Sequence, residues 1–402
     1  MATYIPLASK PRYEILDGLR GVAAMIVVAF HLFETYSAGP RFQILNHGYL
    51  AVDFFFVLSG FVIGYAYDDR WGRMSLGGFF KRRLVRLHPM LIMGTLIGAL
   101  LFFFGDAPGF ELVGQTSIGT LMLVTLLGCC MIPLVPWWDI RGWQEVNPLN
   151  GAAWSLMWEY VANILYALVI RRFPTLLLGV FVGFSALLTI DVAMDIDTFM
   201  LLSPRSYAQY TVIGGFGLSP DQIYIGIARL LYPFFMGLLI SRIPSLRLRV
   251  RGGFWWCSLL LAIMLCCPYA GTEAHPWLDG LYNVGVILVM CPLLVVMGSG
   301  SFLTDNRSMA ICKWLGAISY PLYITHYPWV YLQIKWAADH KDAPLGHHIF
   351  VAVSIFIIVV AIAWATLKLY DLPLRQWLTD HWLRRTKAPA KQPQPVEAPQ
   401  AN

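Results

Sequence analysis

The sequence has few charged side chains. Asp, Glu, Lys and Arg make up 13% of its 402 residues, against about 25% in soluble domains, and 58% of the residues are hydrophobic. This balance excludes an ordinary soluble domain and predicts an all-α, polytopic membrane protein. The formal net charge of +6 is too small to favour a nucleic-acid partner.

Cysteine motifs are also lacking. The seven cysteines form no CxxC pair and no Cys/His cluster with zinc spacing. We therefore expect buried apolar cysteines, no metal and no permanently bound cofactor. A cleavable signal peptide is not indicated either, because Asp17 and Arg20 interrupt the first apolar segment. We expect that segment to be a retained helix.

Long apolar runs, by contrast, are plentiful. Eleven of them approach the ~20 residues needed to cross a bilayer: 14–36, 48–67, 88–105, 117–135, 152–170, 174–191, 223–240, 254–268, 279–298, 314–335 and 348–369. Residues 1–387 therefore read as one membrane domain. Residues 388–402 are rich in Pro, Gln and Ala and are expected to form a disordered cytoplasmic tail.

The charge of the loops sets the expected topology. Basic residues gather before residue 88, at 171–172, at 242–251 and after the last apolar run. Positive loops stay cytoplasmic, but three crossings between residues 88 and 171 would put two of these loops on opposite sides. We therefore predict that 117–135 is re-entrant or interfacial. About ten transmembrane helices then remain, with both termini cytoplasmic.

The first apolar segment carries ionisable residues at membrane depth. Arg20 and His31 are eleven residues apart, about 20° from three full turns, so they share a helix face roughly 16 Å apart. Asp17 and Glu34 continue the stripe. Such groups usually face a bundle interior or a wet cavity. Either Asp17 and Arg20 form a structural ion pair beside a core histidine, or His31 is a general base in a site.

Two other segments carry candidate residues near their ends. Asp53 is either an interfacial cap or an active-site acid, and Gly60 and Gly64 make a face for close helix packing. A basic run contains three arginines: Arg82, Arg83 and Arg86. This run is either a positive-inside anchor or a phosphate clamp, since guanidinium groups bind phosphate bidentately.

Two later stretches complete the candidate set. Ser155 and Glu159 follow Trp154 and share a helix face, because they are four residues apart. A carboxylate at that depth needs a partner or a wet cavity. Tyr320 and His326 lie in a segment with two prolines that can kink the helix.

In their order along the chain, these stretches resemble the membrane-bound acyltransferase 3 family of bacterial integral-membrane enzymes. The resemblance runs from Leu16 to about Pro373. The matching motifs are Arg20 with His31, Val52 to Phe61, Arg82 with Arg83 and Arg86, Trp154-Ser155-Leu156 with Glu159, and Ile318 to Pro328. The family implies a core of ten helices with a cytoplasmic N-terminus, as the loop charges do.

The resemblance also implies a function at the bacterial inner membrane. An acyl group, most often acetyl, would move from cytoplasmic acyl-CoA to a hydroxyl of a cell-surface or exported glycan. The implied donor-binding residues are Arg20, Arg82, Arg83 and Arg86. The implied catalytic residues are His31, as base or acyl carrier, with Glu159 and Asp53 to orient it or the acceptor. The implied cavity residues are Asp17, Trp154, Ser155, Tyr320 and His326.

Two questions stay open at this point. A transporter or flippase for a glycan or lipid-linked intermediate is the alternative, because intramembrane ionisable residues are ordinary there. Such proteins often have paired halves with broken helices, which the sequence lacks. Some family members carry a secreted esterase-like domain. None is found here, and we expect the membrane portion to perform transfer alone. Acceptor identity, acyl length and oligomeric state are not indicated.

Overall fold

The computed structural model describes residues 10–37, 43, 45–105, 110, 112–202, 205 and 208–383. These residues form helices and connecting loops, with no β-strand among them. The expected all-α, polytopic architecture is thereby confirmed. The expected tail at 388–402 lies outside the described residues.

The helices differ in length more than the apolar runs suggest. In chain order they are α1 (Glu14–Glu34), α2 (Ala51–Tyr67), α3 (Leu76–Phe104), α4 (Ile118–Cys129), α5 (Ala153–Leu168), α6 (Thr175–Ala193), α7 (Pro220–Arg242), α8 (Gly253–Cys266), α9 (Trp277–Gly285), α10 (Cys291–Gly300), α11 (Asn306–Thr325), α12 (Tyr327–Asp339), α13 (Leu345–Thr366) and α14 (Leu372–Leu378). π-helical turns join α9 to α10 (Val286–Met290) and α13 to α14 (Leu367–Asp371), and another follows α14 (Thr379–Leu383).

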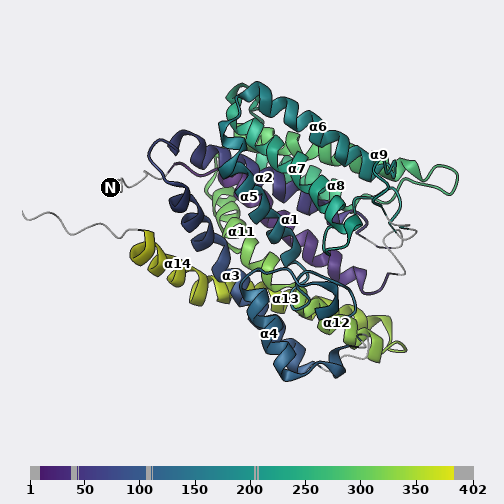
Figure 1. Ribbon diagram of the computed structural model, residues 1–402. Helices are drawn as coiled ribbons and strands as arrows, with labels where there is room; N and C mark the ends of the chain where they lie inside the picture. Colours follow the sequence, from purple (N-terminus) through teal and green to yellow (C-terminus); the bar gives the residue numbers. More distant parts are fainter. Residues whose placement is uncertain are drawn as a thin grey trace, which may run out of the picture.

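The helices run between two ends of one bundle, which we call the Arg20 end and the His31 end after the residues of α1. In Figure 1, α14 lies near the Arg20 end and α12 near the His31 end. Contacts tie the four basic regions to the Arg20 end: Lys10 with Asp69, Arg171 with Trp71, Arg242 with Asp68, Arg247 with Tyr13, and Lys81 with Trp382. The basic loops therefore gather at one end, as the charge argument requires.

Helix α4 does not run from one end to the other. Its 12 residues cover about 18 Å, against about 30 Å for the hydrocarbon core of a bilayer. The chain leaves α3 at the His31 end, and the loop before α5 returns there: a Cβ at Gly98 of α3 would overlap the carbonyl of Leu149. In the described part of the chain, the other helices form ten segments, α1, α2, α3, α5, α6, α7, α8, α9–α10, α11–α12 and α13–α14, of which seven are long and apolar enough to cross a membrane.

Two expected boundaries are corrected. The basic run was expected in the loop before residue 88, but α3 already begins at Leu76 and contains it. Ser75 caps that helix by accepting from the Gly78 amide at 3.1 Å, and Lys and Arg are good helix formers. The run 314–335 is two helices rather than one span, broken at His326 beside Pro328.

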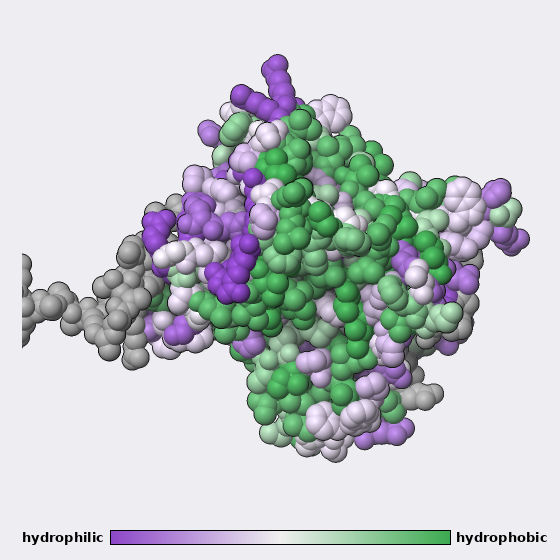
Figure 2. All heavy atoms as spheres, turned by 45° about the horizontal axis from the view of Figure 1, so that its top comes forward, coloured by the Kyte–Doolittle hydropathy of each residue, from purple (hydrophilic) through white to green (hydrophobic). Residues whose placement is uncertain are grey.

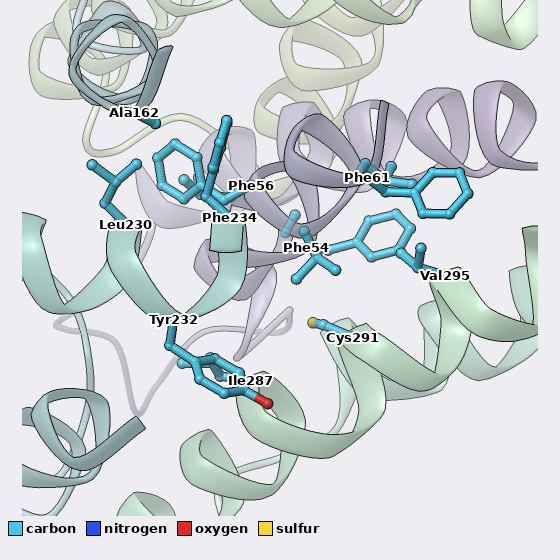
Figure 3. Packing of buried hydrophobic residues seen from close by; sticks show 14 of the residues in the cluster. Phe54, Phe56, Phe61, Ala162, Leu230, Tyr232, Phe234, Ile287, Cys291 and Val295 are labelled. Carbon is cyan, nitrogen blue, oxygen red and sulfur yellow. The ribbon is translucent and has the colours of Figure 1, made fainter. Parts of the chain in front are cut away.

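The tightest packing in the bundle joins α2 to α7. A Cβ at Gly60 would overlap the carbonyl of Phe234, and one at Gly237 would overlap that of Val57. The glycines therefore bring the two backbones into contact, as small residues do between membrane helices. Figure 3 shows Phe54 and Phe61 of α2 packed beside α7 and α10 in this core.

The outer surface is apolar over wide areas. Seven helices in the described residues are long and apolar enough to cross a membrane. The last of them is Leu345–Leu383, and only 11% of its most apolar 18-residue stretch is buried in the protein. Figure 2 shows a broad hydrophobic face with polar residues gathered to its sides. An apolar face of this size is unfavourable in water, so this face of the protein is suited to contact with lipid.

Candidate active site

Helix α1 presents Arg20 to α11 and His31 to the break between α11 and α12, so the two residues of its shared face meet one continuous segment. Arg20 donates from Nε to Ser319 Oγ at 2.8 Å and from Nη2 to the Gly316 carbonyl at 3.2 Å. Asp17 lies one turn earlier and accepts from Arg20 Nη2 at 3.0 Å. A Cβ at Gly316 would lie 2.8 Å from Asp17 Cβ. The two helices are thus close enough for one stripe of α1 to reach α11 directly.

Arg83 and Arg86 of α3 join Arg20 at this end, and we call these three residues the arginine cluster. Arg83 is buried and donates to Glu159 at 2.5 Å. Arg86 lies within electrostatic range of both Arg20 and Arg83. Its side chain is exposed, and no hydrogen-bond acceptor or ion-pair partner of it occurs among the described residues. Three neighbouring guanidinium groups, of which that of Arg86 is exposed and unpaired among the described residues, are suited to attract an anion.

Arg82 differs from its neighbours. It donates to the Gly78 carbonyl of its own helix at 2.9 Å, whereas Arg83 faces the bundle. Successive helical residues point about 100° apart, so Arg82 and Arg83 point in different directions, with Arg86 between them. The structure brings Arg83 and Arg86, but not Arg82, into the cluster with Arg20.

At the opposite end, His31 is part of a group that we call the histidine site: His31, Glu34, His326 and Tyr327. Glu34 Oε2 lies 2.7 Å from His31 Nδ1. Because a carboxylate only accepts, the neutral imidazole carries its proton on Nδ1 and leaves Nε2 as a base. Glu34 therefore orients the His31 ring while its own side chain stays 49% exposed.

His326 covers the His31 ring. The two rings stack with centroids 5.4 Å apart, and Tyr327 meets His31 edge-on at 4.8 Å. His326 is fully buried and donates from Nδ1 to the Tyr323 carbonyl at 2.7 Å, while its Nε2 has no partner among the described residues. The break between α11 and α12 positions these two rings, because it turns the chain at His326.

Asp53 does not approach His31. It forms a fully buried ion pair with Arg229 of α7, with Oδ2 2.7 Å from Nη2 and Oδ1 3.2 Å from Nε. Arg229 also donates to the carbonyls of Tyr49 and Gly214. The pair therefore joins the first turn of α2 to α7. The Trp154 ring lies under the same guanidinium at 5.1 Å, so this face of the ring is already occupied.

Glu159 also pairs with arginine rather than histidine. Its Oε1 accepts from Arg83 at 2.5 Å and from Ser59 at 2.6 Å, on the side of the arginine cluster. The expected contact with His31 is not found among the described residues. Glu159 instead fixes Arg83, while Arg86 keeps its exposed side chain.

The remaining predicted residues lie between the two ends. Ser155 Oγ is 2.8 Å from the Tyr323 hydroxyl, and Tyr323 meets His326 at 5.8 Å. Tyr320 donates to the Leu87 carbonyl at 2.5 Å and so joins α11 to α3. Ser155 therefore neighbours the histidine site, whereas Tyr320 serves helix packing near the arginine cluster.

Sequence reasoning missed Arg229, Tyr327 and Glu145. A lone arginine within the apolar run 223–240 was a signal for Arg229, since a buried cation needs a partner. Glu145 lies in the loop before α5 and offered no spacing signal. In the described residues, no group of three His, Cys, Asp or Glu side chains is placed to bind a metal ion.

A helical bundle with a stacked histidine pair at one end, an arginine cluster at the other and a wide apolar surface is that of a polytopic membrane protein. The sequence profile described as "Acyltransferase domain" matches residues 13–368. The chain belongs to the acyltransferase 3 family, and the resemblance drawn from its motifs is confirmed.

Curated relatives include two named O-acetyltransferases. The putative peptidoglycan O-acetyltransferase YrhL of Bacillus subtilis is 25% identical over 87% of this chain and 53% of its own length. Peptidoglycan O-acetyltransferase OatA of Listeria monocytogenes is 22% identical over 80% of this chain and 50% of its own. The chain thus spans about half the length of these two relatives. Protein 2 in picA locus of Rhizobium radiobacter is 34% identical over 39% of this chain and 81% of its own length. No solved structure matches.

Proposed function

We propose that the protein is an integral-membrane O-acetyltransferase that moves an acetyl group from acetyl-CoA to a hydroxyl of a glycan. The observation that carries this proposal is the single face of α1, with Arg20 in a cationic cluster and His31 in a basic site eleven residues away. An anionic donor held at one end can extend its thioester arm toward the other. The names of the two O-acetyltransferase relatives support the reaction and a glycan acceptor.

The arginine cluster is the proposed donor site. Coenzyme A carries phosphates, which Arg86 and Arg20 are suited to bind because guanidinium groups form paired hydrogen bonds with phosphate oxygens. Arg83 adds positive charge while Glu159 holds its position. The basic loops gathered at this end support a cytoplasmic orientation by the positive-inside rule. Both termini then face the cytoplasm, and the histidine site faces the outer side of the inner membrane.

His31 is the proposed general base. Its Nε2 takes the proton of the acceptor hydroxyl while the oxygen attacks the thioester carbonyl, and the C–S bond breaks as the new C–O bond forms. The proton then passes to the departing thiolate. Glu34 holds the Nδ1 proton and stabilises the imidazolium that forms in this step. An alternative order, in which His31 first takes the acetyl group, uses the same atoms.

Purified protein in liposomes, given labelled acetyl-CoA and soluble muropeptides, tests the proposal. Labelled O-acetyl product is expected from wild type, and His31→Ala is expected to lose at least about 100-fold of the rate, the usual contribution of a general base. Equal rates in both would remove His31 from the reaction. Muropeptide movement across the membrane without acetyl-CoA, and without product, would instead indicate a transporter.

Mass spectrometry of the intact protein separates the two orders of reaction. Incubation with acetyl-CoA alone is expected to leave an acetyl adduct only if His31 carries the group covalently. His31→Ala is the matched control, because any acetyl adduct that remains in its spectrum must lie on another side chain.

A further inference from the structure

The loop between α4 and α5 brings a carboxyl group to the histidine site that neither the sequence motifs nor the proposed mechanism uses. Glu145 is buried, with 7% of its surface exposed. Its Oε2 accepts from the Tyr331 hydroxyl at 2.5 Å. No ion pair of Glu145 with a Lys, Arg or His side chain occurs among the described residues. A buried carboxyl without a direct ion-pair partner, beside a candidate site, is itself a functional candidate.

Gly151 shows how closely Glu145 approaches the site. A Cβ on Gly151 would lie 2.5 Å from Tyr327 Cε1 and 2.6 Å from Glu145 Oε1. The Glu145 carboxyl and the Tyr327 ring therefore both lie close to the backbone of Gly151. Tyr331 also meets Tyr327 edge-on at 5.0 Å. Glu145 thus lies beside the ring that contacts His31 and supports it through Tyr331.

The charged and titratable groups around Glu145 come from three elements. Tyr327 and Tyr331 belong to α12, and Glu34 of α1 lies within electrostatic range. Arg141 and Asp139 belong to its own loop. Arg141 does not pair with the carboxyl: its guanidinium lies over the Tyr331 ring at 3.7 Å and donates to the Pro148 carbonyl.

We propose that Glu145 is a positioning residue of the histidine site, which holds Tyr327 against His31 while its own carboxyl is neutral. This inference rests on the proposed acetyl transfer. Ionisation would place a buried negative charge in range of the Glu34 carboxylate, and Arg141, which forms no ion pair with Glu145, would offset it only in part. Such a charge is costly, so the loop and the Tyr327 wall are expected to loosen when the proton leaves.

The ionisation of Glu145 falls within the physiological pH range. Burial raises the pKa of Glu145 to about 7, against opposing contributions from the Tyr331 hydrogen bond and from Arg141. The folded protein then binds this proton between pH 4.5 and 7, where the unfolded chain has released it. Stability from this group is therefore present below pH 4.5 and is lost as the pH rises toward 7.

Glu145→Gln is the main test, because glutamine has the shape of the neutral acid but cannot ionise. In liposomes with labelled acetyl-CoA and soluble muropeptides, the ratio of variant to wild-type kcat/KM should rise about tenfold from pH 6 to pH 8, as expected for a group with a pKa of about 7. Tyr331→Phe removes a donor to the carboxylate, so it should move the decline of transfer to higher pH. Glu273→Gln, which removes an exposed carboxylate from the α8–α9 loop, should leave the profile unchanged.

A second readout does not depend on transfer. Thermal unfolding in detergent should show wild type losing stability relative to Glu145→Gln as the pH rises from 5 to 7. If the variant-to-wild-type activity ratio, or the Tm difference between the two proteins, does not change with pH while the wild type is active, the proposed role of Glu145 is wrong and the proposed function still stands. Absence of labelled product from wild type at every pH would overturn the proposed function instead.

Discussion

Two contacts between an acidic and a basic side chain in this protein differ in their surroundings. Asp53 and Arg229 are both fully buried and bonded to each other, and Arg229 also donates to backbone carbonyls. His31 and Glu34 lie at the rim of the bundle, where the Glu34 side chain is 49% exposed. The first contact has no lone pair or proton to offer a substrate. The second leaves His31 Nε2 available, so openness rather than residue type separates the reactive contact from the structural one.

Removing Asp53 should give the largest effect on folding. Asp53→Ala leaves the Arg229 cation buried without its partner, which costs about 3–5 kcal/mol. The expected result is a large fall in Tm in detergent or loss of monodisperse protein. Asp69→Ala is the matched control, because Asp69 pairs with Lys10 at an exposed position and such pairs contribute about 1 kcal/mol or less.

A double variant sharpens the same comparison. Replacing both partners, as Asp53→Leu with Arg229→Met, removes the buried charges together and should restore much of the stability. If the double variant folds and still transfers acetyl, Asp53 has no catalytic role. If it folds but is inactive while retaining the His31–Glu34 contact, the buried pair belongs to the reaction and the contrast drawn above is wrong.

The sequence predicted what a single helix encodes and missed what lies between helices. Arg20 and His31 share a face because of their spacing, and they meet α11 and the α11–α12 break, respectively. The parity of the basic loops excluded one crossing, and α4 is short. Asp53 and Arg229, however, are 176 residues apart, and no periodicity reports such a pairing. The same limit applies to Glu159, whose partner Arg83 belongs to another helix.

The loops show the same limit more strongly. Glu145 reaches Tyr331 across 186 residues, and its loop folds against α12 through Arg141 and aromatic rings. Neither apolar periodicity nor charge counting applies to such a segment. Its place depends on packing at the His31 end, which only the assembled bundle defines.

The second-largest effect is expected in donor binding. Arg86→Ala removes an exposed guanidinium, and a hydrogen bond to a charged group contributes about 1.5–3 kcal/mol. The KM for acetyl-CoA should therefore rise about tenfold or more, with little change in Tm. Arg82→Ala is the matched control on the same helix, since Arg82 lies outside the arginine cluster and bonds its own Gly78 carbonyl. Equal KM changes in the two variants would indicate that the basic run of α3 serves as a positive-inside anchor and not as a donor site.

Glu34→Gln should give the smallest effect and tests the open contact directly. Glutamine can still accept the proton of His31 Nδ1 but lacks the charge that stabilises the imidazolium. A charged hydrogen bond exceeds a neutral one by about 1 kcal/mol, so kcat should fall about fivefold, while KM for acetyl-CoA and Tm stay near their wild-type values. Glu34→Ala should lose more, because the ring then has no acceptor at Nδ1. A fall in Tm as large as that of Asp53→Ala would show that this rim contact also maintains the fold, and openness would no longer distinguish the two contacts.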